Sequence, residues 1–328
     1  MLLNSHDGAI GSGGRFLRPS SNIVACFDKN KRSRFGGGEA ELLTTFERVK
    51  LILDQLCPQV DAVGGQAQAR MKAFFCALDA EYPLLWDGNR SPVDYGDPAC
   101  HAAYIFKYVT ANAELIYQSL WQAREELAAI LSHPVITVIC VGGGPGTELF
   151  ALFKYLERMP HHVKAIKCIV LDHNPAWAAA YEALLATRPA GVDVAVELLS
   201  IQLADPSSIP IDRIVEADLL TFSYSLSESW RYNGPSGGAV DKSVQAIISA
   251  VKPGALIVYS DNAGPHFDPN MEREFLGRVD LRQINRTDYT HMLVGADEQM
   301  DTLKEYKTWL DMRPKLTGKA TTAVFAKL

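Results

Sequence analysis

The sequence lacks several features that would assign it to a specialised class. Its 6 cysteines include no C-x-x-C pair, so neither a zinc site nor a disulfide framework is indicated. No apolar run is long enough to span a bilayer, and no basic segment followed by an apolar run opens the chain as in a secretory signal. The net charge of −6 gives no overall field that would gather nucleic acid. We expect an intracellular protein, cytoplasmic or nuclear, with no metal and no membrane partner.

The chain divides into three stretches of different composition. Residues 1–38 are rich in glycine, serine and basic side chains, which favours a flexible tail because such a segment offers little apolar surface to offset its ordering entropy. A basic arm that contacts a polyanion such as RNA is the open alternative. Residues 39–131 have helical periodicity and form the predicted N-terminal cap, and residues 132–328 form the third stretch.

The cap is predicted to contain three helices. The first ends before Pro58, the second covers 66–78, and the third runs over 97–131 with Pro98 in its first turn. Tyr104 and Tyr108 fall on one face of the third helix. We expect that face to pack in the core, and the wall of a ligand pocket is the alternative.

Residues 137–147 read T-V-I-C-V-G-G-G-P-G-T and organise the third stretch. The apolar, β-branched start predicts a strand buried on both faces, and the residues from Glu148 onwards have a helical pattern. Strand, glycine turn and helix in this order form the backbone cradle with which α/β proteins bind nucleotide-like ligands. Gly142, Gly144 and Gly146 would let the main chain approach such a ligand closely.

Two cofactor classes use such a turn, and its details favour one of them. A dinucleotide fingerprint would need glycine or alanine at Thr147, and Pro145 removes an amide where a pyrophosphate needs donors. The pattern G-x-G-P-G-T instead resembles motif I of the class I S-adenosylmethionine (SAM) dependent methyltransferases. This resemblance implies a Rossmann-like α/β sheet, mostly parallel with an antiparallel last strand, and SAM as cofactor. It assigns the turn residues to cofactor binding, namely Gly142, Gly143, Gly144, Gly146 and Thr147.

Acidic residues follow the next two predicted strands. Asp172 ends the strand over 166–171, where a carboxylate can accept both hydroxyls of an adenosine ribose; a helix N-cap is its other interpretation. His173 is its neighbour and is placed in the same cofactor site. Asp205 follows the strand within 193–203, and the resemblance implies a contact with the adenine amino group, while a turn residue explains it equally well.

The fourth predicted strand and its exit loop, 217–228, correspond in the resemblance to motif IV beside the transferable methyl group. Ser223 and Tyr224 are expected near the cofactor, and Glu228 is a candidate general base. The sequence N/D-P-P-Y/F is absent, so methylation of an exocyclic base amine is not supported.

The remaining elements complete the predicted sheet. A K-P-G turn at 252–254 enters a strand over 255–260, and two more catalytic candidates, Asp261 and His266, follow it. A helix over 270–277, strands over 281–285 and 321–327, and a helix over 303–310 between these strands end the chain. The last two strands match the closing antiparallel pair of the methyltransferase fold.

The sequence therefore predicts a SAM-dependent methyltransferase, and it leaves the acceptor open. A small or medium-sized metabolite in a pocket closed by the N-terminal helices is slightly favoured, and RNA of the ribosomal type is the alternative. Two rivals belong to other classes. One is a catalytically silent SAM-binding protein, and the other is an NAD-dependent oxidoreductase, which Pro145 and Thr147 disfavour.

Overall fold

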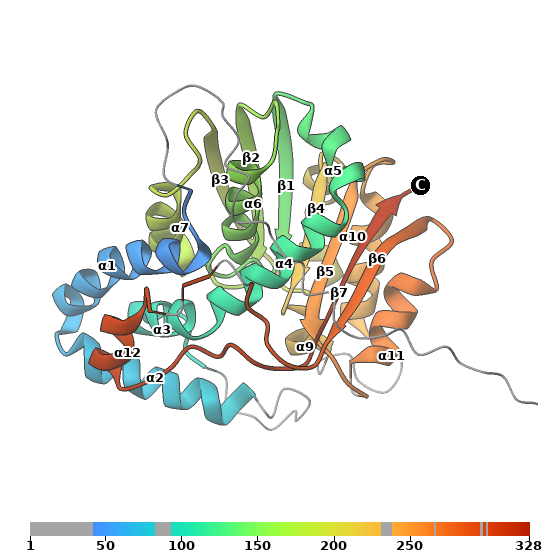
Figure 1. The fold of residues 1–328 in the computed structure, drawn as a ribbon. Coiled ribbons are helices and arrows are strands. Elements are labelled where there is room, and N and C mark those ends of the chain that lie inside the picture. Colours follow the sequence, from blue (N-terminus) through green and yellow to red (C-terminus); the bar gives the residue numbers. More distant parts are fainter. Residues whose placement is uncertain (1–41, 83–92, 231–237, 266, 296–297, 300) are drawn as a thin grey trace, which may run out of the picture. The chain divides into compact units, whose positions relative to one another are not determined.

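The computed structural model describes residues 42–82, 93–230 and 238–328, apart from 266, 296–297 and 300. The predicted tail over residues 1–38 lies outside this part. At its centre is a sheet with the strand order β3-β2-β1-β4-β5-β7-β6 (Figure 1). The strands are β1 (Val135–Val141), β2 (Ala165–Asp172), β3 (Asp193–Ser200), β4 (Leu219–Ser223), β5 (Leu256–Asn262), β6 (Leu281–Tyr289) and β7 (Ala320–Lys327).

The pairing of the strands confirms the predicted fold class. Strands β1 to β5 are all parallel to one another, whereas β7 is antiparallel to both β5 and β6. A Rossmann-like α/β sheet with an antiparallel last strand is therefore present. The order reverses direction between β1 and β4, and open sheets of this kind bind ligands in the crevice outside the carboxyl ends of such a strand pair.

The two faces of the sheet carry separate hydrophobic cores. Val138 of β1 faces one core and Ile139 faces the other, because successive side chains of a strand point to opposite faces. The first core includes α6 (Thr147–Arg158), α7 (Ala178–Leu185) and the N-terminal helices, and the second includes α10 (Ala239–Ala250) (Figure 1). Burial on both faces explains why the β1 sequence is an unbroken apolar run.

The N-terminal region is helical, as predicted, but its first helix is longer than expected. The elements are α1 (Thr45–Gly64), α2 (Ala67–Glu81), α3 (Pro98–Tyr104), the π-helix η2 (Ile105–Val109), α4 (Thr110–Gln122) and α5 (Arg124–Leu131). The prediction that the first helix ends before Pro58 is wrong, since α1 continues through Pro58 to a cap at Gly65. Val60, beyond the proline, is fully buried, so packing offsets the hydrogen bond that proline removes.

The predicted helix over 97–131 is present as four consecutive pieces. Pro98 is in the first turn, as expected, and Asp97 caps the helix by accepting a hydrogen bond from the Ala99 amide at 2.7 Å. The π-turn of η2 then changes the phase of the helix, and the turn at Ala123 separates α4 from α5. The division into a helical cap over 39–131 and a SAM-binding methyltransferase domain over 132–328 remains a prediction.

The other described helical elements are short. They are η3 (Pro175–Trp177), η4 (Pro206–Ser208), α8 (Ile211–Ile214), α9 (Leu226–Ser229), α11 (Asp268–Met271), the π-helix η6 (Glu272–Leu276) and α12 (Lys304–Leu310). None of the helices in the described ranges combines the length and the apolar character that a membrane crossing needs.

Candidate functional site

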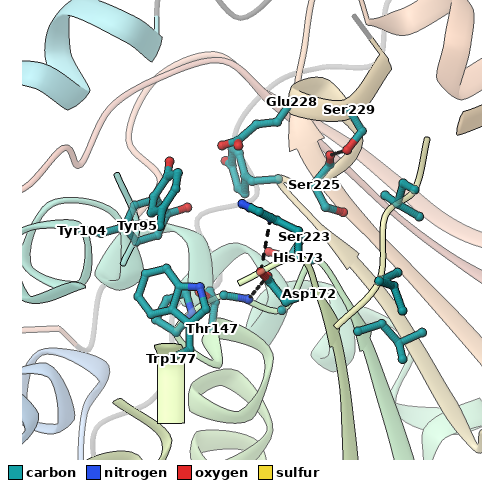
Figure 2. A pocket seen from close by; sticks show the side chains of 18 of the residues that line it. Tyr95, Tyr104, Thr147, Asp172, His173, Trp177, Ser223, Ser225, Glu228 and Ser229 are labelled. Carbon is teal, nitrogen blue, oxygen red and sulfur yellow. Dashed lines mark hydrogen bonds and ion pairs between the residues drawn. The ribbon is translucent and has the colours of Figure 1, made fainter. Parts of the chain in front are cut away.

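A cavity of about 390 Å³ opens at the carboxyl ends of β1, β2 and β4. Its wall consists of the glycine turn after β1, the end of β2, the exit of β4 and tyrosines from the N-terminal helical region (Figure 2). This volume and position are typical of small-molecule sites in open α/β sheets.

The glycine turn forms the floor of the cavity and also joins β1 tightly to α6. Gly142, Gly143 and Gly144 line the cavity, as does Thr147 in the first turn of α6. Gly146 is not part of the wall. A Cβ atom at Gly146 would lie 2.8 Å from side-chain atoms of both Leu184 and Tyr181, and its φ is +85°, so this glycine serves the packing of α6 against α7.

Gly144 differs from Gly146 in what surrounds it. Its φ is +43°, and a Cβ atom there would meet nothing closer than 3.9 Å, with Trp177 as the nearest side chain. The glycine therefore leaves open space on the cavity side of the turn, where a ligand can approach the backbone.

Asp172 lies at the tip of β2, directly beside the glycine turn. Its Oδ2 accepts a hydrogen bond from the Gly144 amide at 2.9 Å, and its Oδ1 accepts one from the Asn174 amide at 2.8 Å. Asn174, not Asp172, caps the following η3 turn. A carboxylate has about four acceptor positions, so Asp172 can accept two further hydrogen bonds from a ligand.

His173 lines the same part of the cavity and is mostly exposed. Its Nδ1 lies 3.4 Å from Oδ1 of Asp172 (Figure 2). The imidazole is the only side chain with a basic nitrogen among the described residues of the wall.

The predicted adenine contact, Asp205, is not in the cavity wall. Its carboxylate accepts hydrogen bonds from the amide of Ser207 at 3.0 Å and from its hydroxyl at 2.6 Å, so it acts as a turn residue at the start of η4. The chain instead contributes Gln202, Leu203 and Ala204 to the wall. A cofactor role for Asp205 remains a prediction.

The exit of β4 supplies the polar end of the cavity. Ser223, Tyr224 and Glu228 line it as the motif IV resemblance implies, together with Ser225. Tyr224 has a φ of +54°, a conformation that costs a side-chain-bearing residue about 1–2 kcal/mol. Such strain tends to occur at functional sites.

The other two catalytic candidates are placed differently from Glu228. Asp261 is fully buried outside the cavity wall, and its Oδ2 accepts hydrogen bonds from the amides of Leu226 at 3.1 Å and Ser227 at 2.9 Å. Burial raises the pKa of Asp261 to about 6, and the hydrogen bonds from Ser227 oppose that rise. The carboxylate fixes the first turn of α9, which carries Glu228. His266 lies outside the described residues.

Three tyrosines from the N-terminal region face Glu228. The hydroxyl of Tyr82 donates a hydrogen bond to Oε1 of Glu228 at 2.7 Å and lies 3.3 Å from the hydroxyl of Tyr95. Tyr104 completes this group and lines the cavity (Figure 2). Burial, and next the negative charge of Glu228, raise the pKa of all three phenols well above the ordinary value, so they are neutral.

Several residues of the wall were not predicted from the sequence. Tyr104 was expected in the core and is both buried and part of the cavity. Tyr82 is at the end of α2 and Tyr95 lies in the turn before α3, and no periodicity marks either residue. Trp177 stacks on His101 with ring centroids 4.1 Å apart and covers the glycine turn. Its position just after Pro175, a residue that favours the first turn of a helix, was the available signal.

Glu148 is the other wall residue that was missed. It follows Thr147 in the first turn of α6, is only 2% exposed, and neither carboxyl oxygen has a hydrogen-bond partner. Burial raises its pKa to about 8, and its own amide and the nearby Thr221 hydroxyl only partly offset this effect. An acidic residue directly after a glycine turn could have been noticed in the sequence, whereas its burial could not.

Acidic side chains predominate in the cavity wall. The wall contains the carboxyl groups of Glu148, Asp172 and Glu228, and no lysine or arginine among its described residues. The described chain also contains no group of three or more His, Cys, Asp or Glu side chains that could hold a metal ion.

Comparisons with known proteins give only distant likenesses. No protein-family model and no curated protein matches the chain. Among solved structures, a precorrin-6y C5,15-methyltransferase from Geobacter metallireducens is 12% identical, with 63% of this chain and 87% of that chain covered and a TM-score of 0.34. A TehB-like SAM-dependent methyltransferase from Corynebacterium glutamicum is 15% identical, with coverages of 63% and 87% and a TM-score of 0.32. On the strand order and pairing described above, the chain has the class I methyltransferase fold.

Proposed function

We propose that the protein is a SAM-dependent methyltransferase. The observation that carries this proposal is the pairing of Asp172 with the Gly144 amide at the switch point of the sheet. The two acceptor positions that remain on Asp172 suit the two vicinal hydroxyls of a ribose. The open space over Gly144 admits the adenosyl group, and Leu203 and Ala204 supply apolar contacts for a purine.

The charge of the wall favours SAM over a dinucleotide. A pyrophosphate would meet the carboxyl groups of Asp172 and Glu228 and, in the described wall, no lysine or arginine. Pro145 also lacks the amide that a phosphate would need at this turn. SAM carries no phosphate and has a positively charged sulfonium, so the same wall suits it.

The residues at the β4 exit are suited to orient and activate an acceptor. Bound SAM supplies an electrophilic methyl group. In-line orientation of a nucleophile by the wall is worth about 7–11 kcal/mol, which is the main task of the protein in such a transfer. In this proposal Glu228 is the general base for a protonated acceptor, a contribution of about 10²–10⁴ in rate. Asp261 positions Glu228 by fixing the first turn of α9. The ring of Tyr224 would face the positively charged sulfonium of SAM.

The observations favour a small-molecule acceptor. A polyanion would have to bring its phosphates to an acidic wall, and RNA-binding sites instead concentrate lysine and arginine. The cavity of about 390 Å³ is of a size that encloses a metabolite.

Isothermal titration with SAM and with NAD tests the cofactor class. We expect SAM to bind with a dissociation constant in the micromolar range and NAD at least about tenfold more weakly, because the wall repels a pyrophosphate. Tighter binding of NAD would contradict the proposal. Transfer of labelled methyl groups from SAM to cell extract then separates a transferase from a silent SAM-binding protein.

A further inference from the structure

We propose that Glu148 distinguishes SAM from its demethylated product, S-adenosylhomocysteine, by releasing a proton when SAM binds and keeping that proton when the product is bound. This inference deepens the proposed function and depends on it, since it gives a role in cofactor selection to a wall residue that the proposed transfer does not use. SAM carries a positively charged sulfonium, whereas the product has a neutral thioether at the same position. A side chain that responds to this one charge can separate the two molecules.

Glu148 lies at the end of the cavity where the sulfur of a bound cofactor is expected. Leu203 and Ala204, the proposed purine contacts, follow β3, and Asp172, the proposed ribose contact, ends β2. The covalent order in SAM is purine, ribose and sulfur, and the order of the strands continues from β3 and β2 to β1 and β4. The sulfur is therefore expected at the β1 and β4 end, where Glu148 stands in the first turn of α6.

The carboxyl group of Glu148 is buried at this end without a partner. The side chain is 2% exposed, and neither oxygen makes a hydrogen bond to any of the described residues. The nearby Thr221 hydroxyl donates to the Ile139 carbonyl at 3.4 Å. The hydroxyl of Ser225, in the same wall, is also buried with no hydrogen-bond partner in the described part of the chain. Because buried polar groups are normally hydrogen-bonded, two such groups at one end of a cavity point to a ligand there.

The titratable groups on the strands and on α7 that face Glu148 favour its protonated form. Asp172 of β2 opposes the ionisation of Glu148 with its own negative charge. Cys140 of β1 and Tyr181 of α7 face the same carboxyl group. The contact with Cys168, together with burial, raises the pKa of Cys140 well above its ordinary value, and burial does the same for the pKa of Tyr181, so both are neutral. Strand β4 contributes no charged side chain.

The cations on the helices packed around Glu148 are engaged elsewhere. Lys154, further along α6, is paired with Glu114 of α4 at 2.6 Å, and Arg48 of α1 is paired with Glu157. The described wall of the cavity contains no lysine or arginine, and its one imidazole, that of His173, lies beyond the end of β2. A cationic ligand would therefore bring the positive charge that this end of the cavity lacks among its described residues.

A bound sulfonium would change the protonation of Glu148. Burial raises the pKa of Glu148 to about 8, so the group holds its proton at neutral pH. A positive charge within about 4–6 Å lowers the pKa of a carboxyl group by about 1–3. Glu148 then loses its proton to water as SAM binds and faces the sulfonium as a carboxylate. After methyl transfer, sulfur has kept the electron pair of the broken carbon–sulfur bond and is neutral, so Glu148 takes a proton back from the solvent.

The pH dependence of the preference for SAM over S-adenosylhomocysteine tests this role. Since SAM alone favours the ionised Glu148, its advantage should grow as rising pH makes deprotonation easier. From pH 6 to pH 8 we expect the ratio of the two affinities to rise about fivefold to tenfold more in wild type than in Glu148→Gln. Calorimetric titration measures both affinities, and the comparison with the variant removes the titration of the ligands' own amino groups. Glu182→Gln, which changes an exposed glutamate on α7, is the matched control and should follow wild type.

Proton release is counted directly by titrating SAM at pH 7 in phosphate and in Tris, two buffers whose ionisation enthalpies differ. Wild type should release about half a proton more than Glu148→Gln on binding SAM, and the two proteins should be alike on binding S-adenosylhomocysteine. Sinefungin, which has a charged amine in place of the methylsulfonium and no methyl group to transfer, should behave as SAM does. Glu148→Met also fills the space without an ionisable group, so it should give the same proton count as Glu148→Gln if that variant folds poorly.

The outcomes keep the two proposals apart. If wild type and folded variants release equal numbers of protons on binding SAM, or show the same pH dependence of the SAM preference, the role of Glu148 is overturned while SAM binding still supports the proposed function. If neither SAM nor S-adenosylhomocysteine binds to wild type, the proposed function is contradicted and the inference falls with it.

Discussion

Glu148 shows how a single residue acquires chemistry that its sequence position does not reveal. Its carboxyl group stands in the first turn of α6, where a negative charge would be favourable near the helix N-terminus. Enclosure by the sheet, α6 and the cavity wall removes water from it, and this effect raises the pKa to about 8. At neutral pH Glu148 is therefore mainly a neutral acid.

This shift predicts a pH-dependent stability. Between about pH 4.5 and pH 8 the folded protein holds a proton on Glu148 that the unfolded chain has released, so the free energy of unfolding falls as the pH rises through this window. From pH 6 to pH 8 the free energy of unfolding of Glu148→Gln should rise by about 2 kcal/mol relative to that of wild type, since the limiting slope is about 1.4 kcal/mol per pH unit. Urea unfolding at both pH values measures the difference.

The control for this experiment is Glu182→Gln, which changes an exposed glutamate on α7. It should follow the wild-type pH dependence. Parallel curves for Glu148→Gln and wild type would show that Glu148 ionises normally.

At the scale of elements, the turn between β1 and α6 combines two tasks that different glycines perform. Gly146 permits the close packing of α6 on α7, whereas Gly144 keeps space for a ligand. The sequence shows both as glycines of one motif and cannot tell them apart, because the difference depends on Leu184, Tyr181 and Trp177, which fold onto the turn from later in the chain.

The same substitution should have different effects at the two glycines. Gly146→Ala should lower the free energy of unfolding by about 2–4 kcal/mol, because its Cβ would meet Leu184 and Tyr181 at 2.8 Å in a left-handed conformation. Gly144→Ala should lower the free energy of unfolding by only about 1–2 kcal/mol, the cost of its left-handed conformation, since its Cβ enters open space. The same variant should weaken SAM binding at least about tenfold. Urea unfolding and SAM titration of both variants test this. A larger stability loss in Gly144→Ala than in Gly146→Ala would contradict these assignments.

Element prediction succeeded where a local pattern determines the structure. The apolar runs of β1 and β2, the glycine turn and Pro98 at the start of α3 follow from burial and backbone chemistry that the sequence displays. The continuation of α1 through Pro58 could not be predicted in this way, because packing around Val60 outweighs the tendency of proline to end a helix. The π-turn of η2 likewise has no sequence marker.

At the scale of the molecule, a buried ion group joins segments that are far apart in the chain. Lys154 of α6 contacts Oε2 of Glu114 at 2.6 Å and Oε1 of Glu298 at 2.8 Å. Glu298 also accepts hydrogen bonds from the amides of Thr45 and Phe46 at the start of α1. The N-terminal helices are thus anchored to the sheet region by charges as well as by a shared core, which gives the tyrosine wall a defined position.

The candidate site could be predicted only in part, because some of its residues are brought together by contacts between distant segments of the chain. The proposed cofactor half of the wall is formed by residues at the ends of strands. Because strand ends in a parallel sheet meet at one edge, Asp172, Ser223 and Glu228 could be placed together. The tyrosines come from helices whose docking on the sheet depends on long-range contacts such as those of Lys154 and Glu298. For Asp205 the sequence left a turn role and a ligand contact open; its carboxylate accepts a hydrogen bond from the Ser207 amide in the turn, and the ligand contact remains a prediction.

The most direct test of the account is the affinity for SAM of wild type, Asp172→Ala and Asp193→Ala, measured by calorimetric titration with the unfolding temperature recorded for each. Loss of two charged hydrogen bonds to the ribose, each worth about 1.5–3 kcal/mol, predicts at least about 100-fold weaker binding for Asp172→Ala. Asp193 is exposed at the opposite end of the neighbouring strand β3, so Asp193→Ala should bind SAM as wild type does. Equal affinity in a folded Asp172→Ala variant would contradict the central claim that the adenosyl group binds over the glycine turn beside this carboxylate.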